Sequence, residues 1–566
     1  MNLKLSFFSV IIAIITLSAN AQNVNFEWAK SIGGMADDLS RSIVIDSYGN
    51  LYITGSFSGT VDFDPGPATF NLTSNGSDDI FITKMDALGN FLWAKNIGGS
   101  LSDFSTSVIT DPLNNVYLTG GFQDIVDFNP GLNLLNLNSN GDYDIFILKL
   151  DSAGNFIWAK SMGGTWFDFS SSIKVDAGGN IYTTGSFTST ADFDPNNSTF
   201  FLSPPPGGSN EIFISKLDSA GNFIWAKSMG GTSIDISYSL AIDEVCNVYT
   251  TGTFRGTSDF DPSSSDYSLG SAGGSDDCFI SKLDSSGNFI WANCFGAMGY
   301  DWGGNITVDK DGNVYTTGSF IGTIDFDPGL TNNYLTSTGD GDIFILKLNN
   351  AGTLVWAKRM GGLGYDYGLV NTVDSVGNVY ITGGFQDTVD FDPGPAFYNL
   401  NSLGGNNIFI LKLNPLGSFE WAKSIGGQSS YNGNSIAIDK LGNVYTTGDF
   451  QGAVDFDPGM NIYNLNSTGG ADVFIQKLSQ ISTGLSEEQV SRFRIFPNPT
   501  NDELNIQVEA SVIGSTYQLS DITGRPITTG IITEKESRIS LQGLSSGTYL
   551  LSIGDQIRKT LKVVKE

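Results

Sequence analysis

The sequence predicts an all-β protein that repeats one four-stranded unit seven times and then adds a small C-terminal β-sandwich. The first observation is the phrase Phe26-Glu-Trp-Ala-Lys-Ser-Ile-Gly-Gly34, which returns six more times in recognisable form. The second is its spacing, because intervals of 65, 65, 67, 66, 65 and 65 residues separate Trp28, Trp93, Trp158, Trp225, Trp291, Trp356 and Trp421. So regular a period indicates one structural unit in series.

Each repeat contains two hairpin patterns. In the first repeat, β-rich runs at 42–46 and 50–55 flank an Asp-x-x-Gly-Asn turn, and runs at 79–85 and 90–95 flank a second such turn. Gly and Asn tolerate the positive φ that these turns require. Two hairpins in series make a four-stranded antiparallel unit, which is one blade of a β-propeller.

The two ends of the array predict a closed ring over residues 22–478. The first Trp-Ala-Lys strand, residues 26–30, precedes any complete repeat, and the last repeat stops after its third strand, residues 472–478. We therefore expect the N-terminal strand to complete the last blade of a seven-bladed β-propeller. An open solenoid would need capping repeats at both ends, and the sequence shows none.

The repeats resemble the bacterial β-propeller repeat of large extracellular proteins (SBBP-like repeats). The shared motifs are Val-Asp-x-x-Gly-Asn-Val-Tyr-x-Thr-Gly and Asp-Ile-Phe-Ile-x-Lys-Leu-Asp-x-x-Gly-Asn, and they recur over residues 26–478. This resemblance implies a fold and no particular activity, because propellers carry many unrelated functions.

The N-terminus, residues 1–21, has the pattern of a secretory signal peptide. Lys4 precedes an apolar run at 5–17, and a small-x-small motif predicts cleavage between Ala21 and Gln22. The apolar run is short for a membrane anchor. No other stretch is long and apolar enough to predict a transmembrane segment.

After a polar linker, residues 479–490, the C-terminal domain at 491–566 carries specific motifs. They are Phe496-Pro-Asn-Pro499, Leu519-Ser-Asp-Ile-Thr-Gly-Arg525, Leu544-Ser-Ser-Gly-Thr-Tyr-Leu550 and a basic end from Lys559 to Lys565. The domain resembles the type A C-terminal sorting domain of the type IX secretion system. The resemblance implies a partner, the secretion machinery, and a secreted or outer-membrane surface location in a Gram-negative bacterium. The alternative is an ordinary β-sandwich with a binding role.

The charge of the chain limits the classes of partner that it can bind. The formal net charge is −30, and residues before Ile481 hold 49 acidic against 20 basic side chains. This field repels nucleic acid and attracts cations. The chain has no His, which excludes Ser-His-Asp and Cys-His catalysis and His-ligated zinc. We expect a binding or scaffold protein, and no enzyme. It should recognise extracellular carbohydrate or protein through the face that carries the longer loops, where much of the negative charge should collect. The alternatives are an Asp-dependent polysaccharide hydrolase or lyase, with or without calcium, and a purely structural surface component.

Each repeat also contains an Asp-Phe-Asp/Asn-Pro motif, within a segment that we expect to form a small hairpin of its own. Asp64, Pro65 and Gly66 fit a β-turn, but turn chemistry leaves Asp62 unexplained. Since alternate residues share a side and calcium prefers carboxylate oxygens, two interpretations stay open, a solvated turn and a calcium site. The only cofactor predicted is calcium, and its candidate ligands are Asp62, Asp64, Asp127, Asp192, Asp194, Asp259, Asp261, Asp325, Asp327, Asp390, Asp392, Asp455 and Asp457.

A second acidic set follows each Gly-Gly pair by four positions and leads into the innermost strands. We expect these side chains either to ring the mouth of the central channel or to accept hydrogen bonds from nearby backbone. The set is Asp38, Asp103, Asp168, Asp235, Asp301 and Asp366, with Tyr431 in the seventh place. The same loops vary in aromatic residues, which suit either sugar stacking or packing between blades: Trp166, Phe167, Tyr300, Trp302, Tyr365, Tyr367 and Tyr431.

Two of the three cysteines lie in one predicted hairpin. Cys278 and Cys294 are symmetric about Ser286, which predicts a cross-strand disulfide in an exported protein. Cys246 takes the place of a turn glycine and has no predicted partner.

Overall fold

The computed structural model describes residues 23–131, 133–329, 331–402, 404–427, 432–481, 493–508, 513–521, 525–553 and 559–565. The predicted signal peptide and its cleavage site, Ala21 and Gln22, lie outside these residues, as does most of the linker. Two compact units divide the chain, one over Ala21–Ile481 and one from Ser482 onward. Regular structure in the described residues is β throughout, apart from one 3₁₀ turn at Ala272–Gly274.

The first repeat forms a four-stranded antiparallel sheet in the order β2-β3-β4-β5. Its strands are β2 (Leu39–Ile45), β3 (Leu51–Asp62), β4 (Asn71–Met85) and β5 (Phe91–Ile97). Five further repeats follow the same order. Their strands are β6 (Phe104–Thr110), β7 (Val116–Asp127), β8 (Asn136–Leu150) and β9 (Phe156–Gly164); β10 (Asp168–Val175), β11 (Ile181–Phe187), β14 (Glu211–Leu217) and β15 (Phe223–Gly231); β16 (Asp235–Ile242), β17 (Val248–Arg255), β20 (Asp276–Leu283) and β21 (Phe289–Phe295); β22 (Trp302–Val308), β23 (Val314–Phe320), β26 (Asp342–Leu348) and β27 (Leu354–Met360); β28 (Tyr367–Val373), β29 (Val379–Phe385), β32 (Asn407–Leu413) and β33 (Phe419–Ile425).

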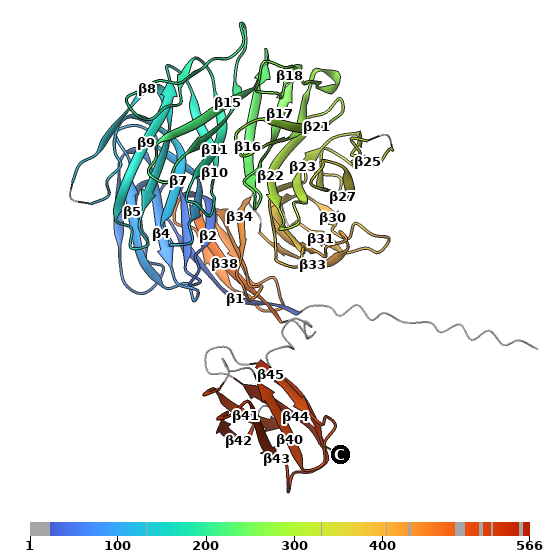
Figure 1. The fold of residues 1–566 in the computed structure, drawn as a ribbon. Helices are drawn as coiled ribbons and strands as arrows, with labels where there is room; N and C mark the ends of the chain where they lie inside the picture. Colours follow the sequence, from blue (N-terminus) through green and yellow to red (C-terminus); the bar gives the residue numbers. More distant parts are fainter. Residues whose placement is uncertain are drawn as a thin grey trace, which may run out of the picture. The chain divides into compact units, whose positions relative to one another are not determined.

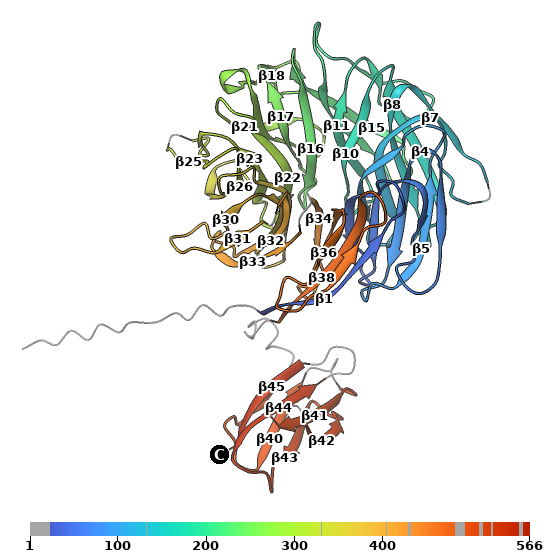
Figure 2. The same ribbon diagram turned by 180° about the vertical axis from the view of Figure 1, so that it is seen from behind.

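The last repeat takes its fourth strand from the N-terminus. Its own strands are β34 (Asn432–Ile438), β35 (Val444–Phe450) and β38 (Asp472–Ile481), and β1 (Asn23–Ile32) pairs antiparallel with β38. This is the pairing that the ends of the array predict. The units succeed one another around a common axis, and β1 lies beside β38 in both views (Figures 1 and 2).

The connection between the second and third strand of each unit forms a small hairpin, as predicted. In the first two units it continues β3 with β4 and β7 with β8. In the others it forms short separate pairs: β12 (Ala191–Asp192) with β13 (Phe201–Leu202), β18 (Thr257–Asp259) with β19 (Ser268–Gly270), β24 (Thr323–Asp325) with β25 (Tyr334–Thr336), β30 (Thr388–Asp390) with β31 (Asn399–Asn401), and β36 (Ala453–Asp455) with β37 (Asn464–Asn466).

The core lies between the units. The second and third strands of each unit are buried on both faces, so their sequences lack the usual alternation of polar and apolar residues. Each hydrophobic cluster described within residues 23–481 joins two neighbouring units, and one of them joins Ile43 and Phe57 of the first unit to Tyr445 and Val473 of the last. Burial of this apolar surface between sheets is the main force that holds the units together.

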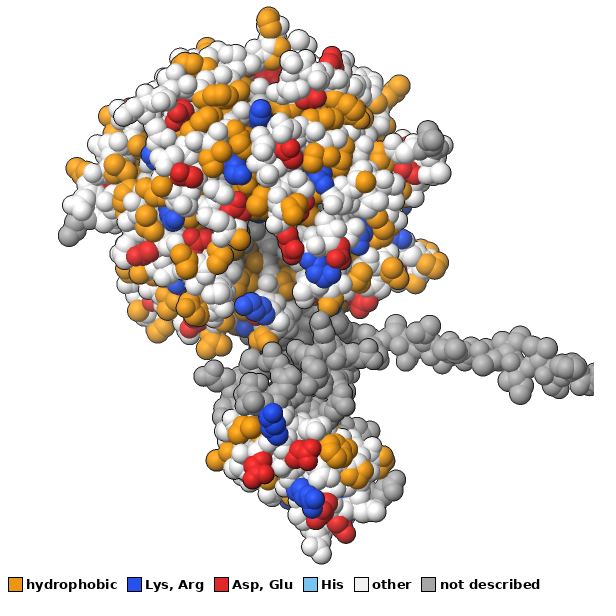
Figure 3. Space-filling model, viewed as in Figure 1, with side chains coloured by type: hydrophobic (Ala, Val, Ile, Leu, Met, Phe, Trp, Pro, Cys, Tyr) orange, Lys and Arg blue, Asp and Glu red, His pale blue; other side chains and the backbone are white. Residues whose placement is uncertain are grey.

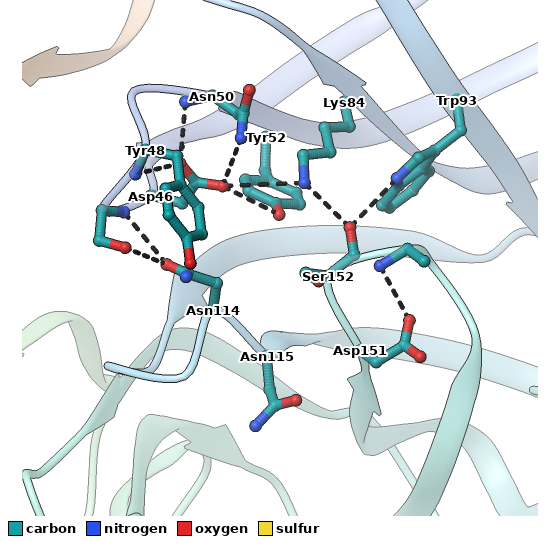
Figure 4. Close-up of polar contacts among 12 residues, drawn as sticks. Asp46, Tyr48, Asn50, Tyr52, Lys84, Trp93, Asn114, Asn115, Asp151 and Ser152 are labelled. Atoms are coloured by element: carbon teal, nitrogen blue, oxygen red, sulfur yellow. Dashed lines mark hydrogen bonds and ion pairs between the residues drawn. The ribbon is translucent and has the colours of Figure 1, made fainter.

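Five of the repeated tryptophans donate a hydrogen bond to a backbone carbonyl of the next unit. Trp93 Nε1 donates to the carbonyl of Ser152 in the following unit at 3.4 Å, and Lys84 Nζ donates to the same oxygen at 2.9 Å (Figure 4). The ammonium also lies 4.7 Å from the centroid of the Tyr52 ring and 3.7 Å from the carboxylate of Asp46. These tryptophans therefore have a structural role in the contact between neighbouring units.

The C-terminal unit contains two antiparallel sheets. One is β39 (Phe493–Phe496), β40 (Glu503–Val508) and β43 (Glu536–Ser540); the other is β42 (Pro526–Ile531), β41 (Thr516–Asp521), β44 (Gly547–Ile553) and β45 (Lys559–Lys565). Leu504 and Ile539 of the first sheet share one core with Leu519 and Leu551 of the second. Two sheets around one core make the predicted β-sandwich.

Candidate binding site

The innermost strands of residues 23–481 surround a cavity, which we call the central channel. It has a volume of about 600 Å³ and is lined by all seven innermost strands, β2, β6, β10, β16, β22, β28 and β34. Its volume falls within the range of small-ligand sites, about 300–1,000 Å³. Small-ligand binding is therefore physically reasonable here.

A β-bulge places one residue of each innermost strand at the wall of this channel. The register shifts at the same place in all seven strands, for example between Ser40 and Ser42 in β2. A bulge leaves one residue unpaired and re-aims its side chain. These bulge residues all line the channel, and they are Arg41, Thr106, Ser171, Tyr238, Gly304, Leu369 and Asn434. Seven different residue types at one position of a regular repeat make the channel asymmetric.

The residue that follows the bulge residue forms hydrogen bonds between neighbouring innermost strands. The hydroxyl of Ser42 accepts the N–H of Val108 at 3.2 Å, and that of Ser239 accepts the N–H of Ile306 at 3.3 Å. Ser435 of the last unit makes the same bond to Ile43 of the first, at 3.2 Å. These bonds make the channel wall a fixed scaffold for the variable bulge residues.

Aromatic residues line one part of the wall, and we call Tyr238, Tyr300, Trp302 and Tyr365 the aromatic arc. Trp302 Nε1 donates to the hydroxyl of Tyr365 at 3.1 Å, and the ring centroids of Trp302 and Tyr238 lie 6.3 Å apart. Three of the four are indicated by the sequence pattern; Tyr238 is not, because its bulge becomes visible only in the strand pairing. By contrast, Trp166 is 60% exposed and lies outside the channel lining. Tyr431 lies outside the described residues.

The acidic set after each Gly-Gly pair is buried and does not ring the channel mouth, so that expectation is wrong. Asp38 is 1% exposed; its carboxylate accepts the N–H of Gly34 at 2.6 Å and of Ser58 at 3.2 Å. The alternative, hydrogen bonding to backbone, is confirmed. The physical reason is that these loops turn inward, where the carboxylate satisfies amides that β-pairing leaves free.

A second buried acid, which the sequence pattern did not predict, faces the first. In one such pair, the carboxyl groups of Glu211 and Asp235 meet beside Gly230. A Cβ atom added to this glycine would lie 2.1 Å from an oxygen of Glu211 and 2.8 Å from an oxygen of Asp235. One oxygen of each added acid has no hydrogen-bond partner among the described residues. The added acids are Asp79, Asp144, Glu211, Asp277, Asp342 and Asp472, each 0–2% exposed.

A sequence signal for these pairs existed. In the one repeat where Tyr431 replaces the first acid, Asn407 replaces the second. Both acids are therefore kept or lost together. Burial raises the pKa of Asp103 to about 7 and that of Glu211 to about 9, against hydrogen bonds from backbone in the first case. Much of the negative charge predicted for the loop face is thus inside the protein, and Figure 3 shows acidic and basic side chains interspersed on the face in view.

The candidate calcium residues have a role in the small hairpin. Asp62 Oδ1 accepts the N–H of Asp64 at 3.1 Å and of Phe70 at 2.8 Å, and Asp64 Oδ1 accepts the N–H of Gly66 at 2.8 Å. The pair of bonds to the first Asp recurs in the other six repeats. This geometry favours the structural turn and explains Asp62 without a cation. The calcium site stays a prediction.

The predicted disulfide does not form, and the cysteines of the structure are free. Cys278 pairs with Phe295 and Cys294 pairs with Phe279, because a bulge between Lys282 and Leu283 shifts the register by one residue. A shift of one turns a side chain to the other face of the sheet. Counting symmetric positions in the sequence could not reveal this bulge.

Comparison with known families identifies the two parts of the chain. Residues 494–566 match the secretion system C-terminal sorting domain, and residues 290–319 and 420–449 match the β-propeller repeat. The chain contains β-propeller repeats and a secretion system C-terminal sorting domain. Its sorting domain indicates passage through the type IX secretion machinery and a secreted or outer-membrane surface location in a Gram-negative bacterium. In the described residues, no helix has the length and apolar character to cross a membrane.

The relatives of this chain are longer proteins with low sequence identity to it. It is 28% identical over 435 residues to an uncharacterized WD repeat-containing protein, L264, of Acanthamoeba polyphaga mimivirus, which covers 64% of this chain and 31% of that protein. It is 24% identical over 240 residues to the regulatory protein FlaEY of Caulobacter vibrioides, covering 41% of this chain and 24% of that protein. The chain thus spans about a third or less of these relatives.

A solved structure with wide coverage is PorZ of Porphyromonas gingivalis, described as an essential bacterial surface component of the type IX secretion system. It is 13% identical, and the match covers 95% of this chain and 100% of that one with a TM-score of 0.18. Superposition at that score does not establish a common arrangement of the two chains.

Proposed function

We propose that this protein is an extracellular carbohydrate-binding protein whose seven units close into one seven-bladed ring around the ligand channel. The aromatic arc is the observation that carries the proposal. Tyr and Trp offer an apolar face with a polar edge, which matches the alternating apolar faces and hydroxyls of a sugar. A repeat made of seven near-identical units needs such a local asymmetry to select one ligand.

Three contacts support closure of the ring. β1 completes the sheet of the last unit, and a hydrophobic cluster joins the last unit to the first. The hydroxyl of Ser435 in the last unit also accepts the N–H of Ile43 in the first unit, as Ser42 and Ser239 do for their own neighbours. The channel lined by all seven innermost strands follows from the same arrangement. A closed ring removes the open sheet faces that would otherwise need capping.

The channel lining supports binding of a carbohydrate without its cleavage. Glycoside hydrolysis ordinarily uses a pair of carboxyl groups beside the scissile bond. Among the described residues that line the channel, none is Asp or Glu. The polysaccharide hydrolase or lyase therefore remains the alternative, and a protein ligand is the second.

A glycan array with the mature protein, followed by calorimetry on each hit, tests the proposal. Trp302→Ala should weaken binding about tenfold or more, as loss of a central aromatic contact does, while Trp166→Ala should leave affinity unchanged. Chromatography of the incubated glycan detects any product. Product release would establish an enzyme instead. Absence of any glycan hit, together with wild-type thermal stability of Trp302→Ala, would overturn carbohydrate binding and favour a protein ligand or a structural role.

A further inference from the structure

The charge of the channel is opposite to that of the protein around it. The chain has 59 acidic and 29 basic side chains. The residues that line the channel nevertheless include two cations, Arg41 and Lys174, and no carboxylate among the described residues. In a chain with twice as many acids as bases, this lining is locally positive. A locally positive wall selects anionic groups at short range.

Lys174 is the cation without a partner. No hydrogen bond or ion pair joins its ammonium to any residue in the part of the chain that the structure describes. Arg41, in contrast, lies near enough to the carboxyl of Asp449 to influence it electrostatically. Burial lowers the pKa of Lys174, because a charge removed from water is costly unless another charge or hydrogen bond offsets it. An anionic ligand would supply that missing partner.

Lys174 is also an exception within its own ring of equivalent residues. It pairs with Tyr182 as Thr307 pairs with Tyr315, so the two occupy the same level of the channel. The other channel-lining residues at this level are Val44, Ile109, Thr307 and Thr372. One ammonium among small apolar and hydroxyl side chains gives the level a single anchoring point.

Lys174 lies near the end of its innermost strand, whereas most of the aromatic arc lies where these strands begin. Trp302 precedes Thr307 by five residues along β22, and a strand rises about 3.3 Å per residue, so the two levels are roughly 15 Å apart. Tyr300 and Tyr365 come from the loops that precede innermost strands, so the arc marks the mouth at the end where these strands begin. A ligand that reaches both levels is an oligosaccharide rather than a single sugar.

We propose that the channel binds an acidic oligosaccharide, with its sugar rings against the aromatic arc and a terminal anionic group accepting hydrogen bonds from Lys174 Nζ. This inference rests on the proposed carbohydrate binding and names the class of its ligand. The anionic group is a uronate carboxylate or a sulfate ester, since both present oxygens to an ammonium in the same way. Neutral hydroxyls and ring faces supply the rest of the contact.

Calorimetry with the full mature protein and three matched probes tests the inference. The probes are a short oligogalacturonide, the same oligosaccharide with its carboxylates methyl-esterified, and a sulfated galacto-oligosaccharide. We expect the charged probe of the correct kind to bind at least about tenfold more tightly than the neutral ester. Preference for the carboxylate or for the sulfate identifies the source of the charge.

Three variants assign the preference to one residue. Lys174→Met should remove the advantage of the charged probe and leave the neutral ester unchanged, whereas Lys174→Arg should keep most of it. Lys227→Met is the matched control, because it removes the same charge from the outer strand β15 of the same unit, and it should have no effect.

The outcomes separate the inference from the function it rests on. Equal affinity for the acid and its ester, with Trp302→Ala still weakening both, would overturn the acidic ligand and keep carbohydrate binding. Binding of neither charged probe when neutral glycans bind would overturn the inference in the same way. If no glycan binds and Trp302→Ala changes nothing, the proposed function fails first. Full thermal stability of Lys174→Met is required throughout and is measured in the same buffer.

Discussion

Replacing Asp144 by Asn should stabilise the protein at alkaline pH and have little effect at acid pH. The Asp144 carboxyl is fully buried and faces Asp168, and one of its oxygens has no hydrogen-bond partner among the described residues. The other oxygen accepts the N–H of Asn140 at 3.0 Å, which an amide oxygen can do equally well. Asn407 already occupies the equivalent position in another unit.

The magnitude follows from the pKa of this group. Burial, with a smaller contribution from the charge of Asp168, raises the pKa of Asp144 from 3.8 to about 7. Each tenfold change in proton affinity corresponds to about 1.4 kcal/mol, so ionising this side chain costs roughly 4 kcal/mol more in the folded protein than in the unfolded chain. We expect Asp144→Asn to recover about 2 to 4 kcal/mol at pH 8.

The sign of the pH dependence is fixed by the direction of the shift. Because the folded protein holds the proton more tightly, wild-type stability is greatest below pH 3.8 for this group and declines as pH rises to about 7. The advantage of the variant should therefore be negligible near pH 4, grow through pH 5 and 6, and level off above pH 7. Chemical denaturation at each of these pH values measures it.

Asp151, directly after the same strand, provides a control for which the expected change in stability has the opposite sign. In Asp151, hydrogen bonds from Asn155 and Ala153 outweigh the effect of burial and lower the pKa of the carboxyl. Asp151→Asn should therefore destabilise the protein at pH 8. If Asp144→Asn instead loses stability at pH 8, an ionised carboxylate is required there. The buried pairs would then hold a cation, and the reasoning from desolvation would be refuted.

Four further outcomes follow from the fold. Deleting residues 23–32 should lower the thermal midpoint of the whole repeat unit, because β1 completes the last sheet; an unchanged midpoint would contradict ring closure. Thiol titration of the denatured, unreduced protein should find three reactive cysteines, and one would indicate the disulfide that the register excludes. Asp62→Ala should cost about 1 to 2 kcal/mol of stability equally with calcium and with chelator, and a loss seen only with calcium would restore the metal site. Removing residues 491–566 should keep the protein from the cell surface, and normal surface display would show that sorting lies elsewhere.

Local patterns predicted the strands, because each turn is specified by its own residues. The Asp-x-x-Gly-Asn turns fold as expected, with Asp46 accepting the N–H of Tyr48 and of Asn50 at 2.9 Å. The N-terminal strand β1 likewise pairs with its predicted partner, β38, since its sequence matches the fourth strand of the other repeats. Patterns of this kind depend on neighbours within a few residues, so they can be recognised without knowledge of the fold.

Bulges and burial were beyond the sequence. The bulge beside Leu283 separates Cys278 from Cys294, and the bulge before Ser239 turns Tyr238 into the channel. Both depend on which strand residues pair, and one extra residue reverses every side chain that follows. The burial of Asp38 was missed for a related reason, because a loop acid has no local signal that tells it to turn inward.

The sequence by itself determined the repeat, the number of units, the order of strands within each unit and the sorting domain, because these are written as recurring turns and motifs. The tertiary structure alone decided what the repeats surround. Strand register brings Arg41, Lys174 and Tyr238 to one wall although they lie in three different repeats, and it places the paired acids against each other inside the loops. Sequence spacing records periodicity along the chain, whereas a binding site depends on which residues of different periods meet in space.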